Sequence, residues 1–138
     1  MPRSLRPYLL SLLASGSMLT GCEKESDSLS GLAGTWKLTN RECFCVPAPV
    51  PNETATFTNS EFSFYKEGQL SASGTYAFTE GKTCGGSTLI PVARLTYATL
   101  NNPPTDVVVT VAGNTLVLDY GIACDAPRET YKRTSTKQ

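Results

Sequence analysis

Histidine is absent from this 138-residue chain, which also has only one tryptophan and two methionines. The chain therefore lacks the commonest general base and the commonest nitrogen ligand of metal ions. Catalytic arrangements that need histidine, such as Ser–His–Asp and Cys–His, are excluded. No glycine-rich segment leads into a helical pattern in the way that a phosphate-binding loop requires. We expect no enzyme and no cofactor.

An excess of charge of one sign is missing too, because 12 basic residues balance 12 acidic ones. Without a basic cluster we expect no nucleic-acid partner. Long hydrophobic runs are also missing, since the longest, residues 8–19, is too short to span a bilayer as a helix. The length leaves room for a single domain.

The N-terminus has the features of an export signal. Arg3 and Arg6 precede the apolar run, and the segment up to residue 22 contains no acidic residue. Residues 19–22, Leu-Thr-Gly-Cys, resemble the lipobox of bacterial lipoproteins. This resemblance implies that residues 1–21 are a cleaved signal peptide and that Cys22 carries lipid, palmitate included. An ordinary secretory signal with an incidental cysteine is the alternative.

A lipid on Cys22 would be the membrane contact of the protein and would place it in the bacterial cell envelope. We expect an outer-membrane lipoprotein, either periplasmic or surface-exposed. Residues 22–33 are small and polar, which predicts a flexible tether, and residues 135–138 are expected to form a short tail. The folded domain is expected over residues 34–134.

That domain has the pattern of an all-β fold. Short runs of alternating apolar and polar residues are separated by Gly, Pro, Asn and Asp, and no helical period appears. The eight expected strands are Thr35–Glu42, Thr54–Thr58, Glu61–Lys66, Leu70–Thr79, Val92–Thr99, Asp106–Ala112, Thr115–Tyr120 and Glu129–Thr134. Pro91 either delays the fifth strand or marks an edge. We predict an antiparallel eight-stranded up-and-down barrel, with a small β-sandwich as the alternative.

Gly34 and Trp36 open the first strand, and Arg133 lies on the last. A Gly-x-Trp start with a late basic residue resembles the lipocalin (calycin) pattern, and residues 34–38 and 120–133 resemble lipocalin-like domains of Bacteroidetes lipoproteins. The resemblance implies that Trp36 closes one end of the barrel and that Arg133 stacks on its ring. The lipocalin helix before the last strand is missing here.

The barrel interior is the expected ligand site. Alternation turns a set of large side chains inward, and eight strands enclose either packed side chains or one small ligand. The candidate ligand-binding residues are Phe57, Phe62, Phe64, Tyr76, Tyr97, Leu116, Leu118 and Tyr131. Strict alternation from Trp36 also points Glu42 inward, although a solvated place at the strand end is the alternative.

Four cysteines remain for disulfides in an oxidising envelope: Cys43, Cys45, Cys84 and Cys124. Cys43 and Cys45 are too close in an extended chain to pair comfortably. Barrel topology favours Cys124 with Cys43 or Cys45, and the other of these with Cys84. The latter pairing needs the loop of Cys84 to fold back; otherwise a strand assignment is wrong or Cys84 stays free. A thiolate site for copper(I) or zinc at Cys43 and Cys45 is the alternative.

Two functions remain open. The first is a membrane-anchored module that binds a small hydrophobic ligand in the barrel. The second is a protein-interaction or inhibitor module that acts through disulfide-pinned loops, among them the proline-rich residues 46–51. We expect a structure to separate the two by showing whether the interior is filled.

Overall fold

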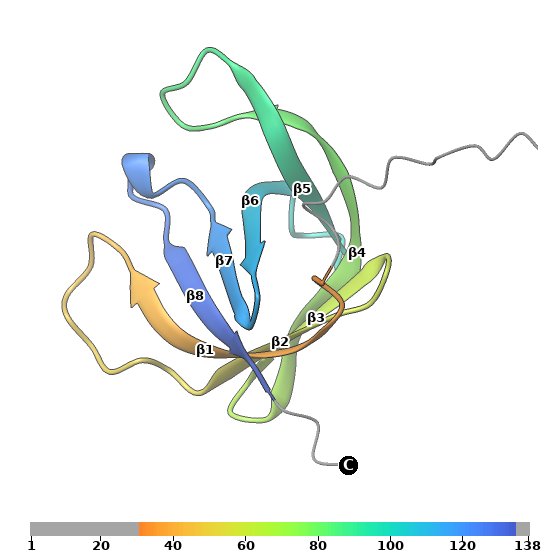
Figure 1. Ribbon diagram of the computed structural model, residues 1–138, viewed down its shortest axis with the longest axis vertical. Helices are drawn as coiled ribbons and strands as arrows, with labels where there is room; N and C mark the ends of the chain where they lie inside the picture. The colour runs from red at the N-terminus through yellow and green to blue at the C-terminus, as the bar shows by residue number, and fades with distance from the viewer. Residues whose placement is uncertain (1–30, 135–138) are drawn as a thin grey trace, which may run out of the picture.

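The computed structural model describes residues 31–134. Eight antiparallel strands follow each other in chain order and close into a barrel (Figure 1). The expectations for residues 1–30, including Cys22, and for the tail 135–138 fall outside the described residues. Within residues 31–134, no helix has the length and apolar character needed to cross a membrane.

The strand bounds match the sequence pattern closely. The elements are β1 (Gly34–Glu42), β2 (Glu53–Phe57), β3 (Glu61–Lys66), β4 (Gln69–Lys82), β5 (Leu89–Tyr97), β6 (Thr105–Ala112), β7 (Thr115–Asp119), the 3-10 turn η1 (Ile122–Cys124) and β8 (Arg128–Arg133). Two-residue turns join β3 to β4 and β6 to β7. Glu67 and Gly68 have φ of 51° and 77°, and Gly113 has φ of 56°, as tight hairpins require. The barrel alternative is confirmed over the sandwich.

Alternate residues of the strands form one packed core. Its fully buried members are Leu32, Trp36, Leu38, Ala55, Phe57, Phe62, Ala93, Leu95, Val107, Leu116, Leu118 and Tyr131. Phe57 and Phe62 make edge-to-face contacts with Tyr76 and Tyr97, at centroid distances of 5.6 and 5.4 Å. Such aromatic pairs add about 0.5–1.5 kcal/mol each to the burial of their area.

Trp36 and Arg133 close one end of the barrel. The tryptophan is fully buried, and its indole N–H donates to the Leu32 carbonyl at 2.9 Å. The guanidinium carbon of Arg133 lies 4.1 Å from the centre of the indole ring. Its N–H groups donate to the carbonyls of Ala33 and Gly31. The structure thus brings together the expected closure residues.

Gly34 belongs to this closure as well. Its φ of 140° favours glycine, and a Cβ at this position would collide with the guanidinium of Arg133. The closure also includes residues before Gly34, because Leu32 is buried in the core. Residues 31–33, which were expected to belong to the tether 22–33, therefore form part of the closure.

A β-bulge changes the register of β1. Leu38 pairs with Tyr131, but Asn40 pairs with Thr130, so Thr39 is the extra residue. One inserted residue reverses the faces of all residues beyond it. Arg41 consequently faces the interior. Glu42 is half-exposed beside Arg128, so the inward position from strict alternation is wrong and the solvated alternative holds.

The β4–β5 hairpin is longer than predicted. β4 pairs with β5 as far as Lys82 and Leu89, whereas β3 stops opposite Thr75 and β6 leaves β5 at Val107. Figure 1 shows this hairpin reaching beyond the other strands. Pro91 lies within its unflanked part, so the alternative in which the proline marks an edge is confirmed.

Candidate functional site at the open end of the barrel

Most of the expected ligand-binding residues belong to the packed core of the barrel. Phe57, Phe62, Leu116, Leu118 and Tyr131 are at most 3 % exposed and belong to the packed core. Tyr76 packs on Phe78 and donates its hydroxyl to the Thr58 carbonyl at 2.5 Å, beside the β2–β3 turn. The filled-core alternative therefore describes the closed half of the barrel.

The open end keeps a cavity of about 310 Å³. Three of the expected residues line it: Phe64, Tyr97 and Tyr131. The remaining wall includes charged groups that the sequence analysis did not single out, above all Arg41, Glu53 and Glu129. The mouth of the barrel is thus part aromatic and part ionic, not uniformly apolar.

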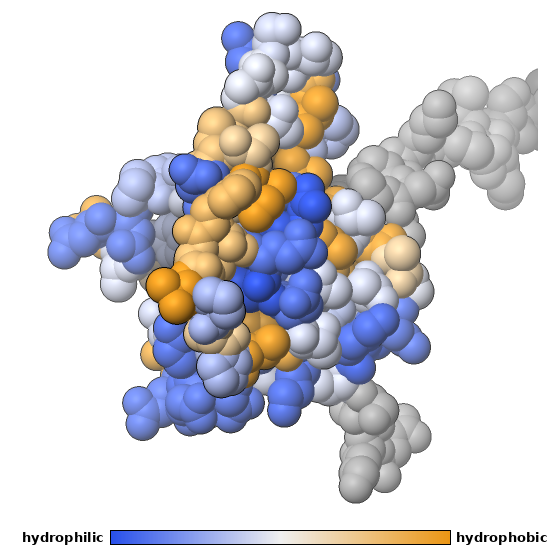
Figure 2. Space-filling view, turned by 90° about the vertical axis from the view of Figure 1, so that its left-hand side faces the viewer, coloured by the Kyte–Doolittle hydropathy of each residue, from blue (hydrophilic) through white to orange (hydrophobic). Residues whose placement is uncertain are grey.

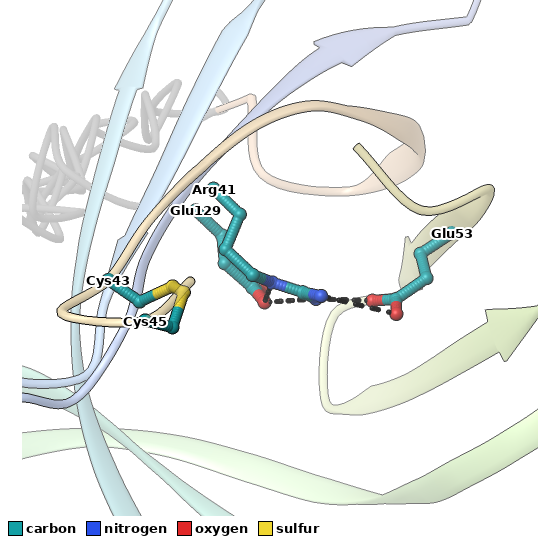
Figure 3. Close-up of a disulfide and its surroundings, with 5 residues drawn as sticks. All are labelled: Arg41, Cys43, Cys45, Glu53 and Glu129. Carbon is teal, nitrogen blue, oxygen red and sulfur yellow. Dashed lines mark hydrogen bonds and ion pairs between the residues drawn. A yellow bond between two sulfur atoms is a disulfide. The ribbon is translucent and has the colours of Figure 1, made fainter. Parts of the chain in front are cut away.

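Arg41 holds the ionic part together. Its Nη2 lies 2.5 Å from Glu53 Oε2 and 2.5 Å from Glu129 Oε1, while its Nε donates to Glu129 Oε1 at 2.8 Å. Figure 3 shows the guanidinium lying between the two carboxylates. Tyr131 donates to the second oxygen of Glu129 at 2.6 Å. Glu129 is only 8 % exposed and depends on these partners, because an unpaired buried charge is costly.

The network shifts the protonation equilibria of its members. Burial alone would lower the pKa of Arg41, but hydrogen bonds and charges from Glu53 and Glu129 outweigh burial and raise it. Burial raises the pKa of Tyr131 and Tyr120, and the negative charge of Glu129 raises both further. Both phenols therefore stay neutral at physiological pH, and Tyr131 keeps the proton that it donates to Glu129.

A second and larger hollow lies outside the barrel proper. The β1–β2 loop, residues 43–52, arches away from the strands and encloses about 770 Å³ together with Ile122 of η1 (Figure 1). Its lining is mainly apolar and comprises Arg41, Glu42, Cys43, Phe44, Cys45, Val46, Pro47, Ala48, Pro49, Val50, Pro51 and Ile122. Alternating prolines hold such a loop extended and keep it out of the sheet.

Several loop side chains are strongly exposed. Phe44 is 76 % and Val46 84 % exposed, and Val50 is also open to solvent. On this face Figure 2 shows a stripe of hydrophobic residues bordered by hydrophilic ones. Contiguous exposed apolar surface of this kind is typical of an interaction site, whereas single exposed apolar residues are common on any protein surface.

The disulfides differ from the predicted pairing. Cys43 bonds to Cys45, and Cys84 bonds to Cys124. The chain turns immediately after β1, which brings the Cα atoms of Cys43 and Cys45 to 5.2 Å, within the range for a disulfide. The assumption that residues 43–45 are extended, which argued against a bond between the two cysteines, was therefore wrong. Among residues 31–134 no group of metal-ligating side chains is assembled at these cysteines or elsewhere.

The long β4–β5 hairpin explains the second bond. It carries Cys84 across to η1, where Gly121 lies against it and Cys124 follows at a Cα distance of 5.9 Å. The strand assignments ended this hairpin too early, at Thr79 and Val92, which is the second of the expected possibilities.

The loop that carries Cys124 is held by Asp119. One carboxylate oxygen accepts the backbone N–H groups of Gly121 and Ile122 at 2.8 and 3.0 Å. The other accepts from Arg128 Nη2 at 2.8 Å. Burial would raise the pKa of Asp119, but these hydrogen bonds and the charge of Arg128 lower it overall. Ile122 is thereby fixed as one wall of the hollow.

Comparison with known proteins adds no relative: no protein-family model, curated protein or solved structure matches this chain. The structure alone therefore supports the coarser conclusion, an eight-stranded antiparallel barrel closed by a Trp–Arg contact and open at a loop-covered end.

Proposed function

We propose that this protein is a lipocalin-like lipoprotein of the bacterial envelope that binds a small hydrophobic ligand. The ligand lies under the β1–β2 loop, not in the barrel interior where the sequence placed it. One observation carries the proposal: the mainly apolar hollow of about 770 Å³ bounded by the loop and Ile122. Ligand sites for small molecules have about this size and composition, with a few polar groups that orient the ligand.

A fluorescent hydrophobic probe, N-phenyl-1-naphthylamine, tests the site. We expect Val50→Asp to weaken probe binding at least about tenfold, because it places a charge in the apolar lining. Leu100→Asp is the matched control, since Leu100 is fully exposed on the β5–β6 loop and outside the hollow. Equal binding by the two variants, or no binding by the wild type, would contradict the proposal.

The anchor is proposed from the signal-like residues 1–21 and from Cys22. An acyl chain contributes about 0.8 kcal/mol per buried CH₂, so two or more chains hold a protein firmly on a bilayer. Metabolic labelling with an alkynyl palmitate should mark the wild-type protein and leave Cys22→Ser unlabelled and outside the membrane fraction. A wild-type protein that is cleaved, unlabelled and soluble would refute the anchor.

A protein partner is the second candidate, and the exposure of Phe44 and Val46 favours it. This function predicts a defined protein that the wild type retains in pull-downs and Phe44→Ala releases. The small-ligand proposal predicts a bound mass of a few hundred daltons in native mass spectrometry and no such partner.

A further inference from the structure

We propose that Cys43–Cys45 is a redox-active disulfide that oxidises the thiols of an apolar polypeptide segment seated in the adjoining hollow. The activity is distinct from the proposed binding of a small ligand and does not depend on it. It needs no histidine and no metal ion. Three features support it: the small ring that the bond closes, the exposure of the bond and the apolar surface next to it.

The two disulfides differ in what they connect: one joins two separate elements, and the other lies within a single loop. Cys84 and Cys124 are 40 residues apart and join the β4–β5 hairpin to η1. Both of these segments are held by hydrogen bonds of their own. Cys43 and Cys45 are separated by two positions and lie within one loop. A cross-link over so short a span restricts the unfolded chain little, so the bond contributes little to folding. Its presence therefore calls for another role.

Backbone hydrogen bonds do not tie the segment around Cys43 and Cys45 to the rest of the described fold. β1 ends at Glu42, and none of the described backbone hydrogen bonds outside the strands involves residues 43–50. Reduction of Cys43–Cys45 therefore breaks no strand pairing. A disulfide that is accessible and not tied into the fold is the kind that exchanges readily with thiols.

The bond is also open to a substrate. Cys45 is exposed and Cys43 half-buried, so Cys45 is the more accessible of the two residues for an incoming thiolate. Both cysteines line the hollow, and Phe44 between them is 76 % exposed. A substrate thiol flanked by apolar residues would place those residues against Phe44, Val46 and Val50 while its sulfur meets Cys45.

The exchange balances without any further reagent. A substrate thiolate attacks Cys45 Sγ, which forms a mixed disulfide and releases Cys43 as a thiolate. A second substrate thiolate then attacks the substrate sulfur of the mixed disulfide and releases Cys45. The substrate loses two electrons and two protons and gains a disulfide, and Cys43 and Cys45 become two thiols.

The first measurement compares the two bonds within one molecule. The full-length protein is equilibrated with graded ratios of reduced to oxidised dithiothreitol, quenched by alkylation and mapped by mass spectrometry. We expect half-reduction of Cys43–Cys45 at a ratio at least about tenfold lower than for Cys84–Cys124. Equal resistance of the two bonds, or alkylation of Cys43 and Cys45 before reduction, would overturn the proposal.

The second measurement follows oxidation of a reduced peptide that carries two cysteines among valine and phenylalanine, in single turnover without oxygen. We expect Cys84→Ser/Cys124→Ser to keep the activity and Cys43→Ser/Cys45→Ser to lose it. Phe44→Ala should weaken peptide saturation severalfold while leaving the half-reduction ratio unchanged. Peptide oxidation that persists in Cys43→Ser/Cys45→Ser would refute the assignment.

Discussion

At the scale of single residues, the open end depends on Arg41. This side chain forms ion pairs with two carboxylates that face the same cavity, and one of them, Glu129, is almost fully buried. Removing one partner of a buried pair costs more than the pair contributes, because the remaining charge stays desolvated. Arg41 is therefore expected to be the most sensitive charged position of the barrel mouth.

Arg41→Met tests this expectation. We predict a loss of about 2–3 kcal/mol in the free energy of unfolding, somewhat below the cost for a fully buried pair, because Arg41 keeps 28 % exposure. Urea denaturation followed by Trp36 fluorescence measures it. Arg94→Met is the control, because Arg94 pairs with Asp106 on the exposed outer surface. We expect this variant to lose much less free energy of unfolding than Arg41→Met. A loss below about 1 kcal/mol for Arg41→Met would contradict the account.

At the scale of elements, alternation predicted all eight strands because the barrel buries one face of each. It could not predict the bulge at Thr39, since the composition of β1 is equally suited to either register beyond that point. Glu129 could have been found, because it lies two positions before Tyr131 on the same face of β8. The disulfide partners could not, because they depend on how far β4 and β5 pair and on the turn after β1.

The η1 segment is an element whose stability should depend on pH. Because the folded state lowers the pKa of Asp119, its carboxylate stabilises the fold above the pKa of the unfolded state. That contribution is lost as the pH falls through the lower folded pKa. The acid limb of a plot of stability against pH should therefore become shallower in Asp119→Asn.

Thermal unfolding between pH 2 and pH 7 measures this slope. Asp125→Asn is the matched control, since it removes the same charge from the same loop, and no side-chain hydrogen bond of Asp125 is present among the described residues. Identical acid limbs for the wild type and Asp119→Asn would show that Asp119 does not hold the loop.

At the scale of the whole molecule, the two ends of the barrel differ in structure: the Trp36–Arg133 contact closes one, and the β1–β2 loop lies at the other. The described chain starts at the closed end, where Gly31 contacts Arg133, and the β1–β2 loop lies at the far end of the nine-residue strand β1. A strand of this length spans roughly 30 Å. With lipid on Cys22, the anchor would enter at the Trp36 end, and the hollow would lie at the end opposite the point of attachment.

Core side chains pack the closed half of the barrel and leave a cavity at its open end, and we propose that the ligand binds outside both, under the β1–β2 loop. Nuclear magnetic resonance of the isotope-labelled protein, titrated with N-phenyl-1-naphthylamine, locates the bound probe. We predict shifts at Phe44, Val46, Val50 and the Ile122 methyl groups, with the methyl groups of Leu116 and Leu118 unchanged. Shifts centred on Leu116 and Leu118, with the loop silent, would place the ligand inside the barrel and contradict this account.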